Sequence, residues 1–210
     1  MLMKNTIEKI YEKANKPSEY ISSYLNHLTH VLDGLNYSAI AKVIELFLNA
    51  RALEKNIFFI GNGGSAATAS HFANDLAIGT RSKKLPFKVM SLTDNSSVIT
   101  AIGNDYGYEQ VFVKQLEACL GSGDLLVAIS ASGNSPNILK AVEYTKENNG
   151  ITIGLTGFDG GELKKIVDHV IHVPTVKGDY GPVEDVHMIL DHVVGNYLMQ
   201  MCREESQSAK

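Results

Sequence analysis

The chain has 210 residues, a length that allows one α/β domain with a sizeable core. Hydrophobic residues make up 44% of it, charged residues 20%, and the formal net charge is −4, so a basic surface for nucleic acid is not expected. No apolar run approaches the roughly 18 residues of a membrane span, and the charged first 13 residues lack the apolar core of a signal peptide. These features predict a cytoplasmic protein that binds neither nucleic acid nor membranes, and whose two cysteines, Cys119 and Cys202, are reduced.

Helices and short apolar runs alternate along most of the chain. Two helices are expected first, over residues 18–34 and 37–55, because apolar residues recur at helical spacing in the second. Five buried strands are expected at 57–60, 87–92, 125–129, 151–155 and 170–173. Further helices are expected at 67–78, 135–149 and 183–203, and Pro136 and Gly150 mark the two ends of the middle one.

This alternation is typical of right-handed βαβ units. It predicts a three-layer α/β sandwich with a five-stranded parallel sheet, of the flavodoxin-like or Rossmann-like kind, with helical extensions at both ends. We expect residues 1–210 to form a single domain, with the core and the C-terminal helix in 56–203 and a polar tail in 204–210. The helices within 1–55 lack an obvious partner in the sheet, so we expect them to pack in an oligomer interface.

A glycine-rich segment, residues 61–66, lies between the first strand and a helical pattern. Glycines let the backbone turn tightly and present its N–H groups, and the dipole of the following helix favours negative charge. The segment therefore predicts a site for an anion such as a phosphate group.

The other strands end in loops of similar chemistry. Residues 93–97 and 130–135 are rich in serine, threonine and asparagine, and residues 156–161 contain three glycines. Ligands of open parallel sheets bind beyond the carboxyl ends of the strands, where these loops meet. The same residue types also make ordinary turns and helix caps, but four such loops at one edge favour a binding site.

A dinucleotide site is the competing interpretation, because Gly61, Gly63 and Ala66 fit the looser Rossmann fingerprint. That fingerprint expects an acidic residue roughly 20 positions further on. Asp94 lies well beyond that offset, so this alternative is the weaker one.

Two histidine–carboxylate pairs are spaced to share a helix face. His71 and Asp75 are four residues apart, and Glu184 and His192 are two turns apart. Together they could hold a divalent metal or serve as an acid/base set, and the alternative is a pair of surface ion pairs. On the last helix Asp191, with His187 nearby, could contribute or lie on its polar face.

Residues 61–65, 71–73, 103–107 and 130–135, with support from 155–161, resemble the SIS (sugar isomerase) family. The resemblance extends from about residue 21 to 201 and is carried by these motifs jointly. It implies an aldose–ketose isomerase that converts sedoheptulose 7-phosphate to D-glycero-D-manno-heptose 7-phosphate through an enediol, as a homotetramer with sites between subunits.

The resemblance also implies roles for single residues by matching position. Asp75 and His192 would transfer the proton, and three serines of the 130–135 loop would hold the phosphate. The implied ligands of a divalent metal, expected to be zinc, are His71, Asp75, Glu184 and His192. The implied substrate-binding residues are Asn62, Gly63, Gly64, Ser65, Asp75, Asn104, Asp105, Ser130, Ala131, Ser132, Ser135 and Glu184.

Three positions depart from the family pattern, which has Glu at Asp75, Gln at Glu184 and Thr at Ala131. Aspartate is one methylene shorter than glutamate, and the extra charge of Glu184 should tighten the binding of a divalent cation. We therefore expect metal to matter more here than in members with Glu and Gln. The departures leave open an isomerase of another sugar phosphate, and a non-catalytic SIS adaptor that binds the replication initiator is the further alternative.

Overall fold

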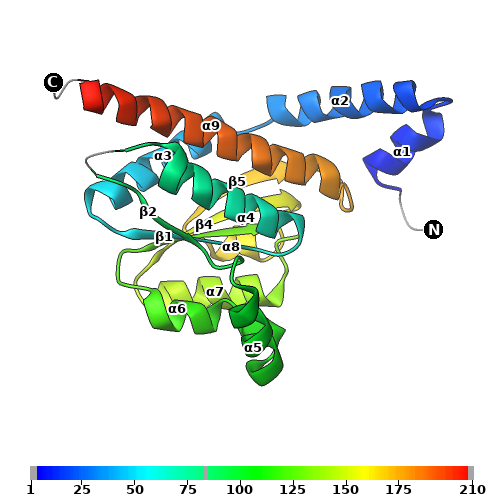
Figure 1. Ribbon diagram of the computed structural model, residues 1–210. Helices are drawn as coiled ribbons and strands as arrows, with labels where there is room; N and C mark the ends of the chain where they lie inside the picture. Colours follow the sequence, from blue (N-terminus) through cyan, green and yellow to red (C-terminus); the bar gives the residue numbers. More distant parts are fainter. Residues whose placement is uncertain (1–3, 83–84, 208–210) are drawn as a thin grey trace.

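The core of the protein is a five-stranded sheet. A computed structural model of the chain describes residues 4–82 and 85–207. Every neighbouring pair of strands is parallel and the order is β2-β1-β3-β4-β5, which confirms the predicted sheet (Figure 1). The strands are β1 (Asn56–Gly61), β2 (Lys88–Ser91), β3 (Leu125–Ser130), β4 (Ile151–Phe158) and β5 (His169–Pro174).

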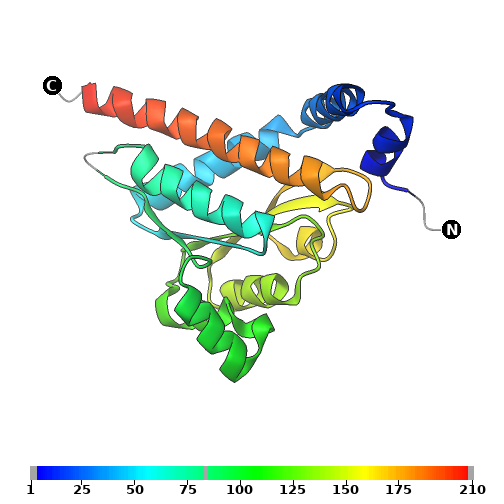
Figure 2. The ribbon, with the colours of Figure 1, turned by 45° about the vertical axis from the view of Figure 1, so that its right-hand side comes forward.

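Helices cover both faces of the sheet, as the predicted three layers require (Figures 1 and 2). One face packs against α3, α4 and α9, and the other against α6, α7 and α8. The helical elements are α1 (Thr6–Lys13), α2 (Pro17–Asp33), α3 (Tyr37–Ala52), α4 (Gly64–Asn74), the π-helical turn η1 (Asp75–Gly79), α5 (Ser96–Tyr106), the 3₁₀ turn η2 (Tyr108–Gln110), α6 (Val113–Cys119), α7 (Pro136–Glu147), α8 (Leu163–Ile166) and α9 (Tyr180–Gln207).

Aromatic side chains join three elements on the α3, α4 and α9 face. The Phe59 ring of β1 lies 4.9 Å from the Phe72 ring of α4 and 6.1 Å from the Phe47 ring of α3, measured between centroids. All three side chains are at most 2% exposed. Edge-on and tilted pairs at such distances add to the stability gained from burial alone, so these contacts hold β1 against α3 and α4.

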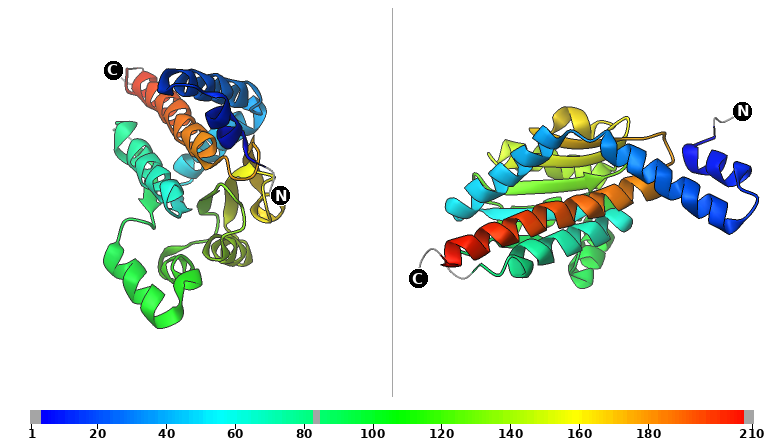
Figure 3. Two further views of the ribbon diagram at one scale, coloured as in Figure 1. Left: turned by 90° about the vertical axis from the view of Figure 1, so that its right-hand side faces the viewer. Right: turned by 90° about the horizontal axis from the view of Figure 1, so that it is seen from above.

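The N-terminal helices differ from one another in their contacts. α3 packs on the sheet through Val43 and Phe47, so this helix has the partner that the sequence did not reveal. α1 buries no residue, and α2 buries only Val31. Both helices project beyond the sheet (Figure 3).

The C-terminal helix is longer than its predicted range of 183–203. α9 begins at Tyr180 and continues to Gln207, into the segment expected to be a polar tail. Arg51, which is 7% exposed, holds this end by donating to both carboxylate oxygens of Glu205, at 2.9 and 2.7 Å. Among the described residues no helix is both long and apolar enough to cross a membrane.

Candidate active site

The sheet order creates a switch point between β1 and β3. The chain leaves β1 towards β2 on one side and later returns to β3 on the other. The loops after β1 and β3 therefore diverge to opposite faces, and the crevice between them is where open α/β sheets bind ligands.

A small cleft of about 170 Å³ lies at this switch point. We call it the serine-loop cleft. One side of the cleft is formed by the start of α7. Ser135 is the N-cap residue of this helix, and Pro136 is its first helical residue. Backbone N–H groups at such a helix start, with nearby hydroxyls, bind a phosphate group without a cationic side chain. The cleft brings together many of the predicted substrate-binding residues: Asn62, Ser65, Ser130, Ala131, Ser132, Ser135 and Glu184, with Ile129 and Tyr180.

Glycines on the β1 side of the cleft lie very close to their neighbours, and at Gly61 the neighbour is backbone that cannot give way. A Cβ at Gly61 would overlap the backbone carbonyl of Ser65, and a Cβ at Gly64 would overlap the carboxylate of Glu184. Gly63 has a positive φ of 54°, a backbone conformation that residues other than glycine rarely adopt. Glu184 therefore lies directly against the glycine-rich loop. Burial raises the pKa of Glu184, and the nearby charge of Asp185 raises it further.

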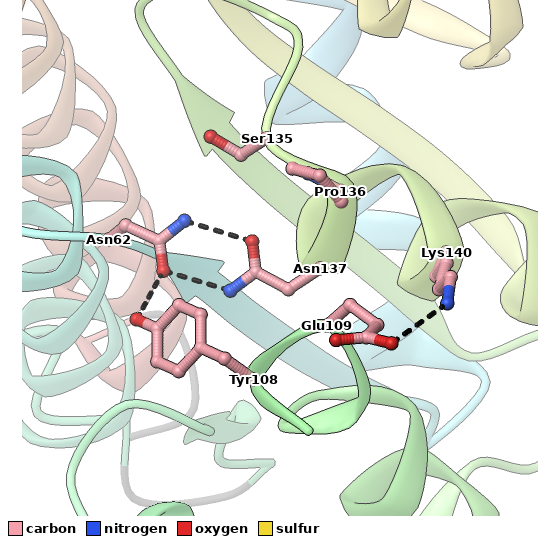
Figure 4. A pocket seen from close by; sticks show the side chains of 7 residues that line it. All are labelled: Asn62, Tyr108, Glu109, Ser135, Pro136, Asn137 and Lys140. Carbon is pink, nitrogen blue, oxygen red and sulfur yellow. Dashed lines mark hydrogen bonds and ion pairs between the residues drawn. The ribbon is translucent and has the colours of Figure 1, made fainter. Parts of the chain in front are cut away.

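A network of three side chains fixes the amide of Asn62 (Figure 4). The backbone N–H of Ile138 donates to Asn137 Oδ1 at 3.0 Å, so this atom must be the amide oxygen. Asn62 Nδ2 donates to the same oxygen at 3.0 Å, and Asn137 Nδ2 donates back to Asn62 Oδ1 at 2.9 Å. Tyr108 Oη must then donate to Asn62 Oδ1, 2.9 Å away.

This network decides what Asn62 can offer a ligand. Its oxygen already accepts from both Tyr108 and Asn137, whereas one of its two N–H groups has no partner in the network. Asn62 therefore meets a ligand mainly as a donor, which suits an oxygen acceptor. A second cleft of about 490 Å³ adjoins on the far side of Asn62, lined by Asn62, Tyr108, Glu109, Ser135, Pro136, Asn137 and Lys140.

A cluster of two histidines and two aspartates lies between the junction of α4 with η1 and the facing part of α9, and each side supplies two of the four residues. His71, Asp75, Asp191 and His192 each offer a ligand atom within 4.8 Å of the others. His71 Nδ1 lies 2.6 Å from Asp191 Oδ2 and 3.8 Å from Asp75 Oδ2. The His71 and His192 rings meet edge to face with centroids 5.2 Å apart. Imidazole and carboxylate groups in this number fit a divalent cation such as zinc.

The cluster differs from the predicted quartet in one member. It contains Asp191, whereas Glu184 lies against Gly64 in the serine-loop cleft. Asp191 and His187 do not lie on a polar face of α9, because both are fully buried. Burial raises the pKa of Asp191 to about 6 against the opposing hydrogen bond from His71. Burial lowers the pKa of His187 to about 4.

Of the predicted substrate-binding residues, five line neither cleft: Gly63, Gly64, Asp75, Asn104 and Asp105. Asn104 and Asp105 are exposed near the end of α5, a helix with no buried residue, and Asn104 donates to Asp105 at 2.8 Å. Tyr108 and Asn137 were not predicted. They contact Asn62 across 46 and 75 residues of sequence, and no local pattern indicates such a contact.

The sheet order and the serine-loop cleft define an open, doubly wound α/β domain with a ligand site at its switch point. The family model described as SIS domain matches residues 19–157. The chain belongs to this SIS domain family. Within the family it lies among the phosphoheptose isomerases. It is 35% identical to the phosphoheptose isomerase of Maridesulfovibrio salexigens over 192 residues, which are 91% of this chain and 89% of that relative.

Solved structures agree with this assignment. The phosphoheptose isomerase GmhA from Neisseria gonorrhoeae has a TM-score of 0.79 at 32% identity, covering 87% of this chain and 98% of that one. A phosphoheptose isomerase from Francisella tularensis has a TM-score of 0.77 at 28% identity, covering 94% and 100%.

Proposed function

We propose that this chain is an aldose–ketose isomerase that converts sedoheptulose 7-phosphate to D-glycero-D-manno-heptose 7-phosphate. The observation that carries the proposal is similarity to phosphoheptose isomerases along nine-tenths of the chain, with a serine-loop cleft at the switch point of the sheet. Ser130, Ser132 and Ser135 hold the phosphate group beside the start of α7. Binding energy from this remote group then positions the reacting end of the sugar.

The reacting end needs groups that take and return a proton between adjacent carbons. We assign this to Asp75 and His192: one removes the proton from the first or second carbon, and the other returns a proton to its neighbour. Asp75 is partly exposed and His192 is exposed, so a substrate can reach both. Asn62 donates to a sugar or phosphate oxygen, and Gly63, Gly64, Ser65, Ala131 and Glu184 shape the cleft around it.

The cluster of His71, Asp75, Asp191 and His192 suits a divalent metal ion, proposed to be zinc. The fit rests on the donor atoms of His71, Asp75 and His192, with Asp191 beside His71. When bound, such an ion would supply Lewis-acid polarisation of a carbonyl oxygen. Glu184 remains a proposed ligand from the family pattern, and Asn104 and Asp105 remain proposed sugar contacts.

An assay of purified protein with sedoheptulose 7-phosphate tests this function, with and without a strong chelator and added zinc. Formation of the aldoheptose phosphate is expected, and it should stop with chelator and return with zinc. Asp75→Ala and His192→Ala should abolish turnover without unfolding the chain, and Asp33→Asn, at an exposed position of α2, is the matched control. Turnover like that of the unaltered protein in either alanine variant would remove that residue from the mechanism.

We further propose a cytoplasmic homotetramer with sites at subunit interfaces. An apolar groove between α3 and α9, lined in part by Leu32, Ile40, Ile44 and Val193, supports an assembly. The two cysteines are free, in keeping with a reducing compartment. Size-exclusion chromatography with light scattering measures the mass of the protein in solution, and the mass of a monomer would refute the proposed assembly.

The alternatives differ in what they require of the cluster. A SIS adaptor has no need of proton-transfer groups, so Asp75 and His192 beside His71 favour an enzyme. An isomerase of another sugar phosphate would use the same groups. It would show turnover in a panel of pentose, hexose and heptose phosphates, but none with sedoheptulose 7-phosphate.

A further inference from the structure

Asp191 is an unusual residue for its surroundings. Its side chain is fully buried on α9, in the same helix face as the buried His187 and Val194, each one turn away. One carboxylate oxygen, Oδ2, lies 2.6 Å from His71 Nδ1, and the other, Oδ1, has no hydrogen-bond partner within the described residues. Burying a carboxylate costs several kcal/mol unless it is fully paired, so an apolar residue would stabilise this position better.

The direction of the hydrogen bond between His71 and Asp191 follows from the charge of the carboxylate. An ionised carboxylate accepts hydrogen bonds and cannot donate them. The proton between the two groups is therefore assigned to His71, on Nδ1, which in the neutral form of the ring leaves Nε2 with its lone pair. The side chain of His71 is 44% exposed, so the ring is anchored at one nitrogen without being enclosed.

The neighbours of His71 make this choice of nitrogen matter. Asp191 and His192 are consecutive on α9, and His192 packs its ring against His71 on the exposed side of the cluster. Asp75, one turn after His71, has its own oxygen 3.8 Å from Nδ1. With Nδ1 occupied by the bond to Asp191, Nε2 is the nitrogen that His71 can offer.

We propose that Asp191 is a positioning residue, which holds His71 as its Nδ1–H tautomer so that Nε2 is free to accept a proton or bind a divalent cation. Hydrogen bonds of this kind set which histidine nitrogen is available, and their loss typically weakens metal binding about 10- to 100-fold. The inference rests on the proposed function only for the use that is made of Nε2. The orientation of His71 itself is independent of any substrate.

The first test measures the tautomer directly. Nitrogen-15 NMR of the histidine rings in full-length, metal-free protein distinguishes a protonated Nδ1 from a protonated Nε2, and His71 is assigned with a His71→Gln variant. We expect the Nδ1–H form in the unaltered protein. An Nε2–H ring would overturn the proposal, and this result requires no altered protein to fold.

The second test changes Asp191 alone. In Asp191→Asn the amide can donate to Nδ1, which moves the ring proton to Nε2, and a comparable substitution beside a catalytic histidine costs a large rate factor for this reason. We expect that switch in the spectrum, zinc affinity weaker by about 10- to 100-fold, and a kcat lower by about 100-fold or more. An unchanged tautomer with unchanged zinc affinity would show that Asp191 is only structural.

The matched control is Asp179→Asn. Asp179 is also fully buried and also lies near a histidine, His27, but it caps α1 by accepting from the N–H groups of Thr6 and Ile7. The Asp179→Asn substitution should leave the His71 tautomer unchanged. If the unaltered protein fails to isomerise sedoheptulose 7-phosphate, the proposed function fails, while the spectra still decide the role of Asp191. Asp191→Leu is the second variant should the asparagine variant unfold, and we expect a mixture of tautomers in it.

Discussion

The buried ring of His187 should make the protein sensitive to acid in a way that one substitution removes. His187 is fully buried on α9, and burial lowers its pKa from about 6.5 to about 4, an effect that the backbone of Thr156 offsets only in part. Because the folded state resists a proton that the unfolded chain accepts, its contribution to stability is complete above pH 6.5 and is lost as the pH falls towards 4. The difference spans about 2.5 pH units at about 1.4 kcal/mol each, or roughly 3 to 4 kcal/mol in all.

Asp191 works in the opposite direction, which is why the effect needs a variant to be seen. Its pKa is raised to about 6, so the folded state takes up a proton more readily than the unfolded chain does between about pH 6 and 4. Acidification therefore stabilises the fold through Asp191 while it destabilises the fold through His187. The unaltered protein should show a shallow pH profile in this window, because the effects of the two residues largely cancel.

The assay is urea unfolding of metal-free protein from pH 7.5 to 4.5 at fixed concentration. Circular dichroism is the suitable signal because the chain contains no tryptophan. In His187→Leu the free energy of unfolding, relative to the unaltered protein, should rise by about 2–3 kcal/mol on going from pH 7.5 to 4.5. His30→Gln, an exposed histidine of α2, is the control and should run parallel to the unaltered protein. Parallel profiles for His187→Leu as well would refute the reasoning.

Three further substitutions probe the clefts and the end of α9. Asn137→Asp places a carboxylate oxygen against Asn62 Oδ1, so sugar-phosphate affinity should fall about tenfold in calorimetric titrations, and an unchanged affinity would exclude the amide network from binding. Gly64→Ala pushes the Glu184 carboxylate aside, so kcat/KM should fall about 100-fold with little change in melting temperature; full activity would mean that Glu184 can move without cost. Arg51→Lys loses the bidentate ion pair with Glu205, and we expect the free energy of unfolding in urea to fall by about 1–3 kcal/mol. An unchanged free energy would show that this ion pair does not stabilise the fold.

The fold could be predicted from the sequence because its signals are local. The apolar runs that became β1, β3 and β4 are buried along nearly their whole length, so hydrophobicity alone indicates them. The place of α3 could not be predicted in this way. Its apolar face was visible, but which surface that face covers depends on Phe59 and Phe72, residues that lie beyond it in the chain.

The site divides along the same line. Loops that follow strands share an edge by topology, so the serine-loop cleft follows from the strand pattern. The partner of His71 does not, because spacing along a helix says which residues share a face and nothing about which other helix lies opposite. Asp75 was found at four residues' distance, whereas the closer contact, Asp191, is 120 residues away.

One helix supplies walls to both parts of the site. Tyr180 and Glu184 of α9 border the serine-loop cleft, and Asp191 with His192 completes the histidine–aspartate cluster, about 12 Å further along the helix at 1.5 Å per residue. Between these two parts of α9, the side chain of His187 is fully buried in the core. One continuous helix therefore fixes the spacing between the two parts of the site. A movement of α9 as a unit would displace both parts together, and any effect of binding at one part on affinity at the other must be equal in both directions.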